Sequence, residues 1–251
     1  MRVSLLIIVS TMLIMACETL LPAEPEENEL LDGPMEGLSS AEERQFLLGD
    51  ISFNDDIFTV AKGLGPIFIG NSCASCHAGD GKGHPFNKFI RFGQTDSAGA
   101  NPFATLGDKG NQLQHKAILG YEPEKLPAGA PFSEFVAPIV TGLGFLDAVT
   151  DADIIAMAEA NALRSDDIRG RPHYNFAPNF VQLRPNSIPK NGMHIHRFGK
   201  KGLTYDLLHQ TVNAYNQDMG IVSYYNPIDP YSGLPEDPEV TRKTINDVVF
   251  T

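Results

Sequence analysis

A single five-residue run, Cys73-Ala74-Ser75-Cys76-His77, constrains this chain more than any other feature. In an exported protein, a Cys-x-x-Cys-His run is typical of covalent c-type haem attachment. Two thiols three residues apart on one helical turn can add to the two vinyl groups of one porphyrin, and the next residue then projects its imidazole toward the iron. We therefore expect one covalent haem c on Cys73 and Cys76, with His77 as the proximal iron ligand.

Three other uses of this run fit the sequence less well. A thioredoxin-like redox pair needs a strand–helix–strand context, whereas glycine-rich loops flank these cysteines. A disulfide between Cys73 and Cys76 suits an oxidising compartment but gives His77 no role. A zinc site needs a fourth ligand and usually a second ligand pair, and the only other cysteine of the chain is Cys17.

The N-terminus is typical of an exported lipoprotein. Arg2 precedes a nearly continuous apolar run over residues 3–15, which is shorter than the roughly 20 residues of a membrane span. Cys17 follows Ile14-Met15-Ala16, which resembles the bacterial lipobox, whose cysteine is acylated; the alternative is an ordinary signal peptide that happens to contain a cysteine. We expect a lipoprotein signal peptide at residues 1–16, lipid on Cys17, and a periplasmic protein anchored at a membrane surface.

Charge separates a leader from the body of the chain. The net charge is -12, and residues 18–56 hold twelve Asp or Glu and one Arg, whereas residues 57–251 hold 19 acids and 17 bases. Residues 17–38 are acidic and proline-rich and cannot build a core, so we expect a disordered tether there. Such a tether could steer a basic redox partner, although a solvated spacer is the simpler interpretation. The chain lacks a basic stripe, which argues against nucleic acid as a partner.

Local patterns predict several helices and a few short strands in the body. Ser40-Ala41-Glu42-Glu43 resembles a capping box and predicts a helix from Ala41 to about Gly49. Thr150 is a candidate cap for a helix to Leu163. An apolar face of Leu208, Val212, Tyr215 and Met219 predicts a helix over residues 204–220. Further helices are expected at residues 67–77 and 237–251, and extended segments at residues 86–92 and 134–140.

Four stretches of the body resemble the di-haem oxidoreductase family of bacterial exported proteins, described as peroxidases and sometimes as thiol oxidoreductases. They occur in the family's order across residues 44–251, and they are Gly63 to Phe68 leading to Ser72 to His77, Gln112-Leu113-Gln114, Ala137-Pro138 with Gly142 to Ala148, and Gly170-Arg171-Pro172 with Ala214 to Ile221. The resemblance implies a mainly α, cytochrome-c-like haem domain with large loop insertions, and a second haem domain downstream.

The chain departs from the family because it contains one Cys-x-x-Cys-His run. We therefore expect residues 39–251 to form a mono-haem domain. It is either the N-terminal, electron-transferring part of a di-haem, peroxidase-like oxidoreductase, or a stand-alone mono-haem carrier lipoprotein without catalytic activity. The expected partner is a redox protein or a second haem domain.

The sixth iron ligand decides the chemistry of such a haem, since a Met or His ligand closes the iron and favours electron transfer, whereas an open iron can bind peroxide. Met219 is our candidate, because it ends an apolar helix face and Gly220 lets the chain turn away behind it. The alternative is a core methionine that fills a gap. The other candidates are Met193, His194, His196 and His209.

Two further sites follow from the resemblance. An open haem needs a distal acid–base group, for which Gln112, Gln114, Glu122 and Glu124 are candidates. Related peroxidases hold calcium between their haem domains, and Asp166-Asp167 offers carboxylates for it, although too few for a complete site.

Overall fold

The computed structural model describes residues 33–81, 83–93, 112–165, 168–200, 202–237, 245–246 and 248–249. Residues 34–251 make up one unit by their contacts, and only this unit is considered below. The predicted signal peptide, Cys17 and most of the predicted tether lie outside the described residues. Within the described part, no helix is both long and apolar enough to cross a membrane.

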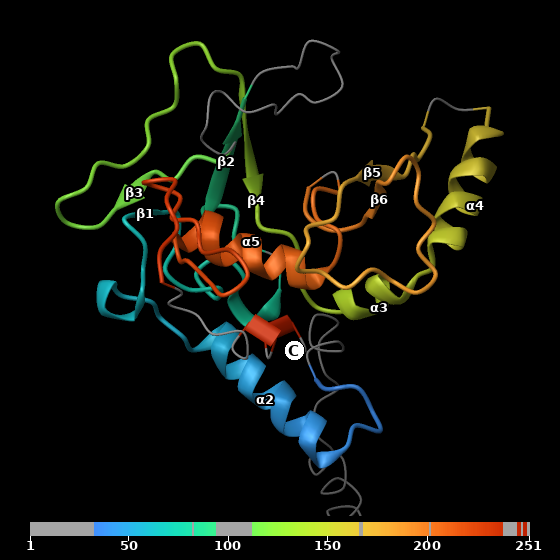
Figure 1. Ribbon diagram of the computed structural model, residues 1–251, viewed down its shortest axis with the longest axis horizontal. Coiled ribbons are helices and arrows are strands. Elements are labelled where there is room, and N and C mark those ends of the chain that lie inside the picture. Colours follow the sequence, from blue (N-terminus) through green and yellow to red (C-terminus); the bar gives the residue numbers. More distant parts are fainter. Residues whose placement is uncertain are drawn as a thin grey trace, which may run out of the picture. The chain divides into compact units, whose positions relative to one another are not determined.

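The described chain contains four α-helices, two short 3-10 helices and six short strands (Figure 1). In chain order these elements are α2 (Ser40–Asn54), η1 (Val60–Lys62), β1 (Ile67–Phe68), η2 (Ala78–Asp80), β2 (Lys88–Phe92), β3 (Lys116–Ala117), β4 (Phe132–Val136), α3 (Leu143–Ala148), α4 (Asp151–Ala162), β5 (His173–Asn175), β6 (His194–His196) and α5 (Leu207–Met219).

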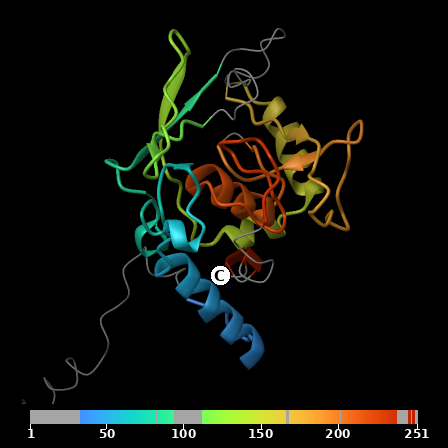
Figure 2. The same cartoon turned by 60° about the vertical axis from the view of Figure 1, so that its left-hand side comes forward.

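The strands form three separate antiparallel pairs, β1 with β3, β2 with β4, and β5 with β6. The longest pair joins β2 to β4 in a register that sets Lys88 opposite Val136 and Phe92 opposite Phe132. Figure 2 shows this pair as two adjacent ribbons. The pair confirms the extended segments expected near residues 86–92 and 134–140.

Helix α5 confirms the clearest helix prediction. The Asp206 side chain accepts a hydrogen bond from the backbone N–H of His209 and caps the helix, and Gly220 ends it in the left-handed region with φ 66°. The side chains of Val212, Tyr215 and Met219 are buried, as the apolar spacing predicts. They pack with Phe58, Ile221 and Ile245, and partly buried Leu208 and Cys73 lie against them. We call this set the α5 core.

Two other helix predictions hold with shifted bounds. Thr150 caps α4 by accepting a hydrogen bond from the backbone N–H of Asp153, as expected. The capping box at the start of α2 is real, but its cap is Ser39 rather than Ser40, and the helix continues past Gly49 to Asn54. Most of the helix expected at residues 237–251 lies outside the described residues. The described residues 245–246 and 248–249 within this range are helical.

The helix predicted over residues 67–77 is wrong. Ile67 and Phe68 form strand β1, and bends and turns follow. The Ser72 hydroxyl accepts a hydrogen bond from the backbone N–H of Ser75 at 3.1 Å, and the Ser75 hydroxyl donates one to the Ser72 carbonyl at 2.7 Å. Such local side-chain bonds offer the backbone an alternative to the helical ladder.

The expectation of a mainly α, cytochrome-c-like fold is also wrong. In the described part of the chain, only helices α2, α4 and α5 are longer than two turns. Short antiparallel strand pairs and loops make up most of the other described residues. The physical reason is the frequency of residues that interrupt helices, since the chain has 23 glycines and 18 prolines among 251 residues. Eleven of the described glycines adopt positive φ, where they end helices and turn loops.

Candidate functional site

Cys73, Cys76 and His77 lie on a single tight turn. The backbone N–H of His77 donates to the Cys73 carbonyl at 2.9 Å, and that of Cys76 donates to the same carbonyl at 3.0 Å. One helical turn is therefore present, and only the short 3-10 helix η2 follows it. Both cysteines are free thiols and half-buried. The turn thus presents two thiols and an imidazole within the span that covalent haem attachment requires.

The segment before this turn is fixed to the end of α5. The carbonyl of Asp218 accepts hydrogen bonds from the backbone N–H groups of Ile69 at 2.7 Å and Gly70 at 3.1 Å, and the Met219 carbonyl accepts one from Gly65 at 3.1 Å. The backbones meet so closely that a Cβ on Gly65 would lie 2.0 Å from the Gly220 carbonyl oxygen. Glycine at both positions lets the segment before the cysteine turn pack against the end of α5.

The two thiols are poor nucleophiles in this environment. Burial raises the pKa of Cys73 to about 12, and the nearby carboxylates of Asp218 and Asp56 add to the shift. Burial also raises the pKa of Cys76, while its contact with Ser75 opposes this. Reactive redox cysteines have lowered pKa values. A thioredoxin-like role therefore does not fit these cysteines.

His77 lies against α2 and the segment that follows the turn. Its ring centre is 6.0 Å from that of Phe53 on α2. Its Nδ1 is buried and has no hydrogen-bond partner of normal geometry among the described residues. Burial lowers the pKa of His77, and backbone groups of Gly81 and Pro138 oppose the shift. The imidazole is thus held neutral, which is the form that ligates a metal.

Met219 shares the α5 core with Cys73. The Met219 side chain is 2 % exposed and packs with Phe58 and Tyr215, and Cys73 lies against the same cluster. The candidate ligand and the attachment turn therefore meet on one end of α5.

The candidate histidines occupy the other end of α5. His194 and His196 lie on β6, and His209 lies in the first turn of α5 with its ring centre 5.9 Å from that of His196. Ten residues separate His209 from Met219, which is about 15 Å along a helix axis. The Cys73 turn contacts the Met219 end of α5, whereas His196 and His209 lie at the other end. Met193 directly precedes β6 and is half-buried.

The family-like stretch at residues 112–114 is tied to the same end of α5. The Gln112 side-chain amide donates to the Asp218 carboxylate, and the Gln114 amide donates to the Gln217 carbonyl at 2.9 Å. The Glu124 carboxylate accepts a hydrogen bond from the backbone N–H of Gln114 at 2.8 Å. Both glutamines are buried. Gln112 and Gln114 thus hold this segment against α5, and Glu124 holds the backbone of Gln114, so all three of these acid–base candidates form structural hydrogen bonds.

Asp218 is a half-buried acid that no sequence pattern indicated. Burial raises its pKa to about 6, and the hydrogen bond from Gln112 and the charge of Arg91 oppose the shift. The nearby Arg91 is mostly buried, and its Nε has no partner among the described residues. The only signal in the sequence was the position of Asp218 directly before Met219, and this position does not predict whether the carboxylate is buried.

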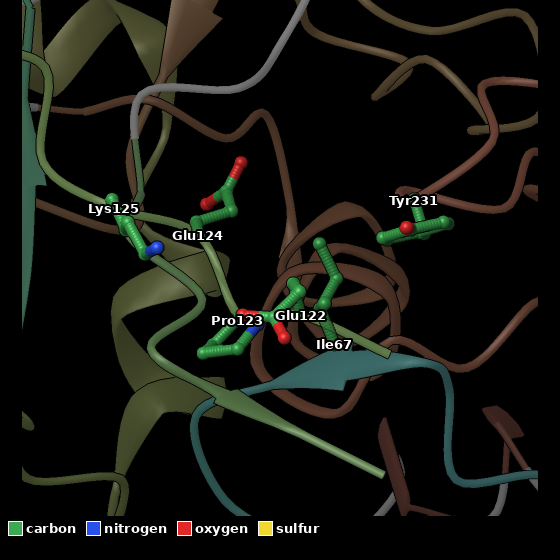
Figure 3. Close-up of a pocket in the computed structure, with 6 residues that line it drawn as sticks. All are labelled: Ile67, Glu122, Pro123, Glu124, Lys125 and Tyr231. Atoms are coloured by element: carbon green, nitrogen blue, oxygen red, sulfur yellow. The ribbon is translucent and has the colours of Figure 1, made fainter. Parts of the chain in front are cut away.

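A cavity of about 300 Å³ is lined by six residues, none of which belongs to the cysteine turn (Figure 3). Figure 3 shows Glu124 and Lys125 on one side of it and Tyr231 on the other. The remaining lining residues are Ile67, Glu122 and Pro123, so Glu122 faces this cavity rather than the thiols. Since no cysteine or histidine lines the cavity, we assign it no part in the haem chemistry.

A family model matches the C-terminal part of the chain. Residues 134–248 are similar to the family described as "Di-haem oxidoreductase, putative peroxidase". This match supports the resemblance found in the sequence. No curated protein and no solved structure matches the chain. The matched residues include Asp218 and Met219, whereas the Cys73–His77 turn precedes them.

Haem is the cofactor that the family name implies, and the residues present fit it. The fit rests on the donor set of the turn, namely two free thiols and a buried neutral imidazole with an unpartnered Nδ1. The calcium candidates Asp166 and Asp167 lie outside the described residues. Among the residues that are described, no group of three or more His, Cys, Asp or Glu could hold a metal ion.

Proposed function

We propose that this protein is an exported c-type haem oxidoreductase of the peroxidase-like kind, acting in electron transfer as part of a di-haem enzyme. Cys73 and Cys76 would hold one haem covalently, and His77 would be its proximal ligand. The observation that carries the proposal is the turn that brings both thiols and the imidazole together. The family match of residues 134–248, whose α5 end anchors this turn, supports the same function.

The chain's own residues would hold and insulate the group. A bound haem supplies one-electron redox chemistry and, where one face of its iron is open, a site for peroxide. The bonds from Ile69 and Gly70 to the Asp218 carbonyl fix the attachment turn against α5. The α5 core, with Phe58, Tyr215 and Met219, keeps water from one side of Cys73.

A second candidate function is a mono-haem electron carrier without catalytic activity. The observation that favours it is the placement of Met219 in the core that Cys73 touches. A methionine ligand on the second axial position would close the iron to peroxide.

The absorption spectra of the ferric and ferrous protein, matured in a bacterial periplasm, distinguish the two functions. We would compare wild type with Met219→Leu, which keeps the buried volume but removes the sulfur. Met157→Leu is the matched control, because Met157 is 63 % exposed on α4. Low-spin iron with a methionine-to-iron band that only Met219→Leu abolishes supports the carrier or an electron-relay half. High-spin iron unchanged by Met219→Leu, together with peroxide turnover, supports the peroxidase-like enzyme.

We further propose that lipid on Cys17 anchors the protein at the periplasmic face of a membrane, where its partner is a redox protein or a second haem domain. The support is the signal-like run before Cys17 and the acidic stretch after it. Membrane fractionation of wild type and Cys17→Ser tests this proposal. Release of the variant alone into the soluble periplasm is expected, and equal release of both proteins would contradict it.

A further inference from the structure

Two histidines face each other across the β5–β6 pair. The register of this antiparallel pair sets His173 directly opposite His196, and Figure 1 shows the two strands side by side. Directly opposite residues project to the same face with their Cβ atoms about 4.5–5.5 Å apart. The two ring centres are 6.2 Å apart.

The loop between β6 and α5 fixes the tautomer of both rings. Nδ1 of His173 lies 2.6 Å from the Gly202 carbonyl oxygen, and Nδ1 of His196 lies 3.0 Å from the carbonyl oxygen of the next residue, Leu203. Because a carbonyl oxygen can only accept, each neutral ring carries its proton on Nδ1 and has a free lone pair on Nε2. Metal-binding histidines commonly have this second hydrogen bond, which orients the ring.

The described residues of the loop lie close to these rings. Gly202 has φ 64°, and a Cβ there would lie 2.9 Å from the His196 carbonyl oxygen and 3.4 Å from Cβ of His173. Thr204 closes the loop through backbone bonds with Arg197 and Phe198. The two carbonyl acceptors are therefore held in place before any ligand binds.

The Nε2 atom of His196 is left without a partner. His196 is 4 % exposed, and its Nε2 is buried with no hydrogen bond among the described residues. The backbone of Phe176 is close enough to affect the ring, but it does not reach Nε2 in hydrogen-bonding geometry. A buried polar atom without a partner costs free energy, which a ligand at Nε2 would recover. His173 is exposed and opens the site to solvent.

The charges around the pair do not exclude a cation. Arg184 is the nearby positive group, and it forms an ion pair with Asp147. Burial lowers the pKa of His196, and burial lowers the pKa of the adjacent His209 to about 4, so both imidazoles are neutral at pH 7. The Nδ1 of His209 accepts a hydrogen bond from the backbone N–H of Tyr205 at 3.2 Å, which leaves its proton on Nε2 and removes it as a ligand.

We propose that His173 and His196 form a two-histidine site for a divalent transition-metal ion of the copper, nickel or zinc class. Imidazole nitrogens suit these ions, and copper binds most tightly in the series. A metal lies about 2.0–2.1 Å from a ligating nitrogen and the ring centre about 1 Å further back, so two rings on one ion have centres about 5.2 Å apart at a tetrahedral angle and at most about 6.4 Å apart when the two nitrogens are opposite one another. The observed 6.2 Å exceeds the tetrahedral separation, so metal binding requires the exposed His173 ring to move toward His196 by about 1 Å.

Water or a partner's side chain completes the coordination, because the described residues offer no third ligand. The site lies at the His209 end of α5, whereas the Cys73 turn lies at the Asp218 end. Metal binding at this pair is therefore independent of haem attachment, and either result can fail without the other.

The test is titration of the haem-loaded, tag-free full chain with Zn²⁺ by calorimetry and with Cu²⁺ by electron paramagnetic resonance. Wild type is compared with His173→Ala and with the control His84→Ala, which removes an exposed histidine in a turn. His173 is exposed, so its truncation leaves the core intact.

We expect one Zn²⁺ per chain and a Cu²⁺ spectrum with hyperfine splitting from two nitrogens. Loss of a supporting group alone costs metal sites about 10–100-fold in affinity, so loss of a ligand in His173→Ala should weaken binding by at least about tenfold. The His84→Ala protein should bind as wild type does. Absence of a one-to-one Zn²⁺ complex in wild type, or equal affinity in wild type and His173→Ala, would overturn the proposal.

Discussion

The side-chain amide of Gln112 donates a hydrogen bond to the half-buried carboxylate of Asp218, 106 positions further along the chain. The same Asp218 uses its backbone carbonyl to hold Ile69 and Gly70, which lead into the cysteine turn. Asp218 at the end of α5 therefore holds both the segment that leads into the cysteine turn and the segment that contains Gln112. Both segments precede the residues that match the family model, and α5 lies within them.

Removing the Gln112 amide should leave the Asp218 carboxylate without its donor. We expect Gln112→Met to lower the free energy of unfolding by about 1–3 kcal/mol, the cost of an unsatisfied buried polar group. The loss should be larger at pH 8 than at pH 5, because Asp218 can take up a proton at the lower pH. Urea unfolding at both pH values measures it. Gln182→Met, at an exposed position, is the control and should change stability little. Equal losses of stability in the two variants would show that the hydrogen bond between Gln112 and Asp218 does not stabilise the fold.

The raised pKa of Asp218 predicts a specific pH dependence. Burial raises this pKa from 3.8 to about 6, so between about pH 4 and 6 the folded protein holds a proton that the unfolded chain has released. The contribution of Asp218 to stability is therefore full below about pH 4 and is lost as the pH rises through 6. Asp218→Asn keeps an acceptor for Gln112 but carries no charge.

The difference in unfolding free energy between Asp218→Asn and wild type isolates this group from all others. It should grow in favour of the variant from pH 4 to pH 6, by about 3 kcal/mol at most, and then level off. Urea titrations at half-unit pH steps measure the difference. A constant difference over this range would show that Asp218 ionises normally.

A buried ion pair fixes the start of α4. Arg197 and Asp151 meet at 2.7 Å with side chains 5 % and 1 % exposed, and Asp151 also accepts a hydrogen bond from the backbone N–H of Ile188 at 2.8 Å. Asp151→Ala leaves the Arg197 charge buried and unpaired, so we expect a loss of about 3–5 kcal/mol. Asp153→Ala, on the exposed side of the same first turn, should cost only about 0.3–1 kcal/mol. Thermal or urea unfolding of the two variants gives the comparison, and similar losses would contradict the assignment.

Gly220 should tolerate no side chain. It has φ 66°, and a Cβ would lie 2.3 Å from the Ile67 carbonyl oxygen. Gly233 has a similar φ of 71° but nothing within 4 Å of a Cβ position, so it is a matched control. Gly233→Ala should cost about 1 kcal/mol for the left-handed backbone alone, and Gly220→Ala about 1–3 kcal/mol more for the clash. If chemical denaturation gives equal values, the close approach of β1 to α5 is incorrect.

Local patterns were sufficient for the features that depend on neighbouring residues. The apolar spacing from Leu208 to Met219 and the glycine behind it predicted α5 and the turn at Gly220, although the helix begins at Leu207 rather than at residue 204. Thr150 likewise predicted the start of α4. A cap or an amphipathic face is defined within about four residues, and the sequence displays it directly.

Features that depend on distant residues were not predictable in this way. One local feature was missed as well, because the hydroxyls of Ser72 and Ser75 form hydrogen bonds that replace the helix expected before His77. The pairing of Asp151 with Arg197 and of His173 with His196 depends on strand register and on loops, which no periodicity encodes. The fold class failed for the same reason, since the family resemblance implied helices where glycine-rich loops and strand pairs stand.

The most direct test of the account asks whether haem is bound covalently through Cys73 and Cys76. The full chain would be matured in a bacterial periplasm and its intact mass and absorption measured after denaturation. We predict that wild type and Cys17→Ser retain one haem per polypeptide, and that Cys73→Ser with Cys76→Ser retains none. A wild-type chain that emerges from denaturation without haem, or a double variant that keeps it, would contradict the central claim.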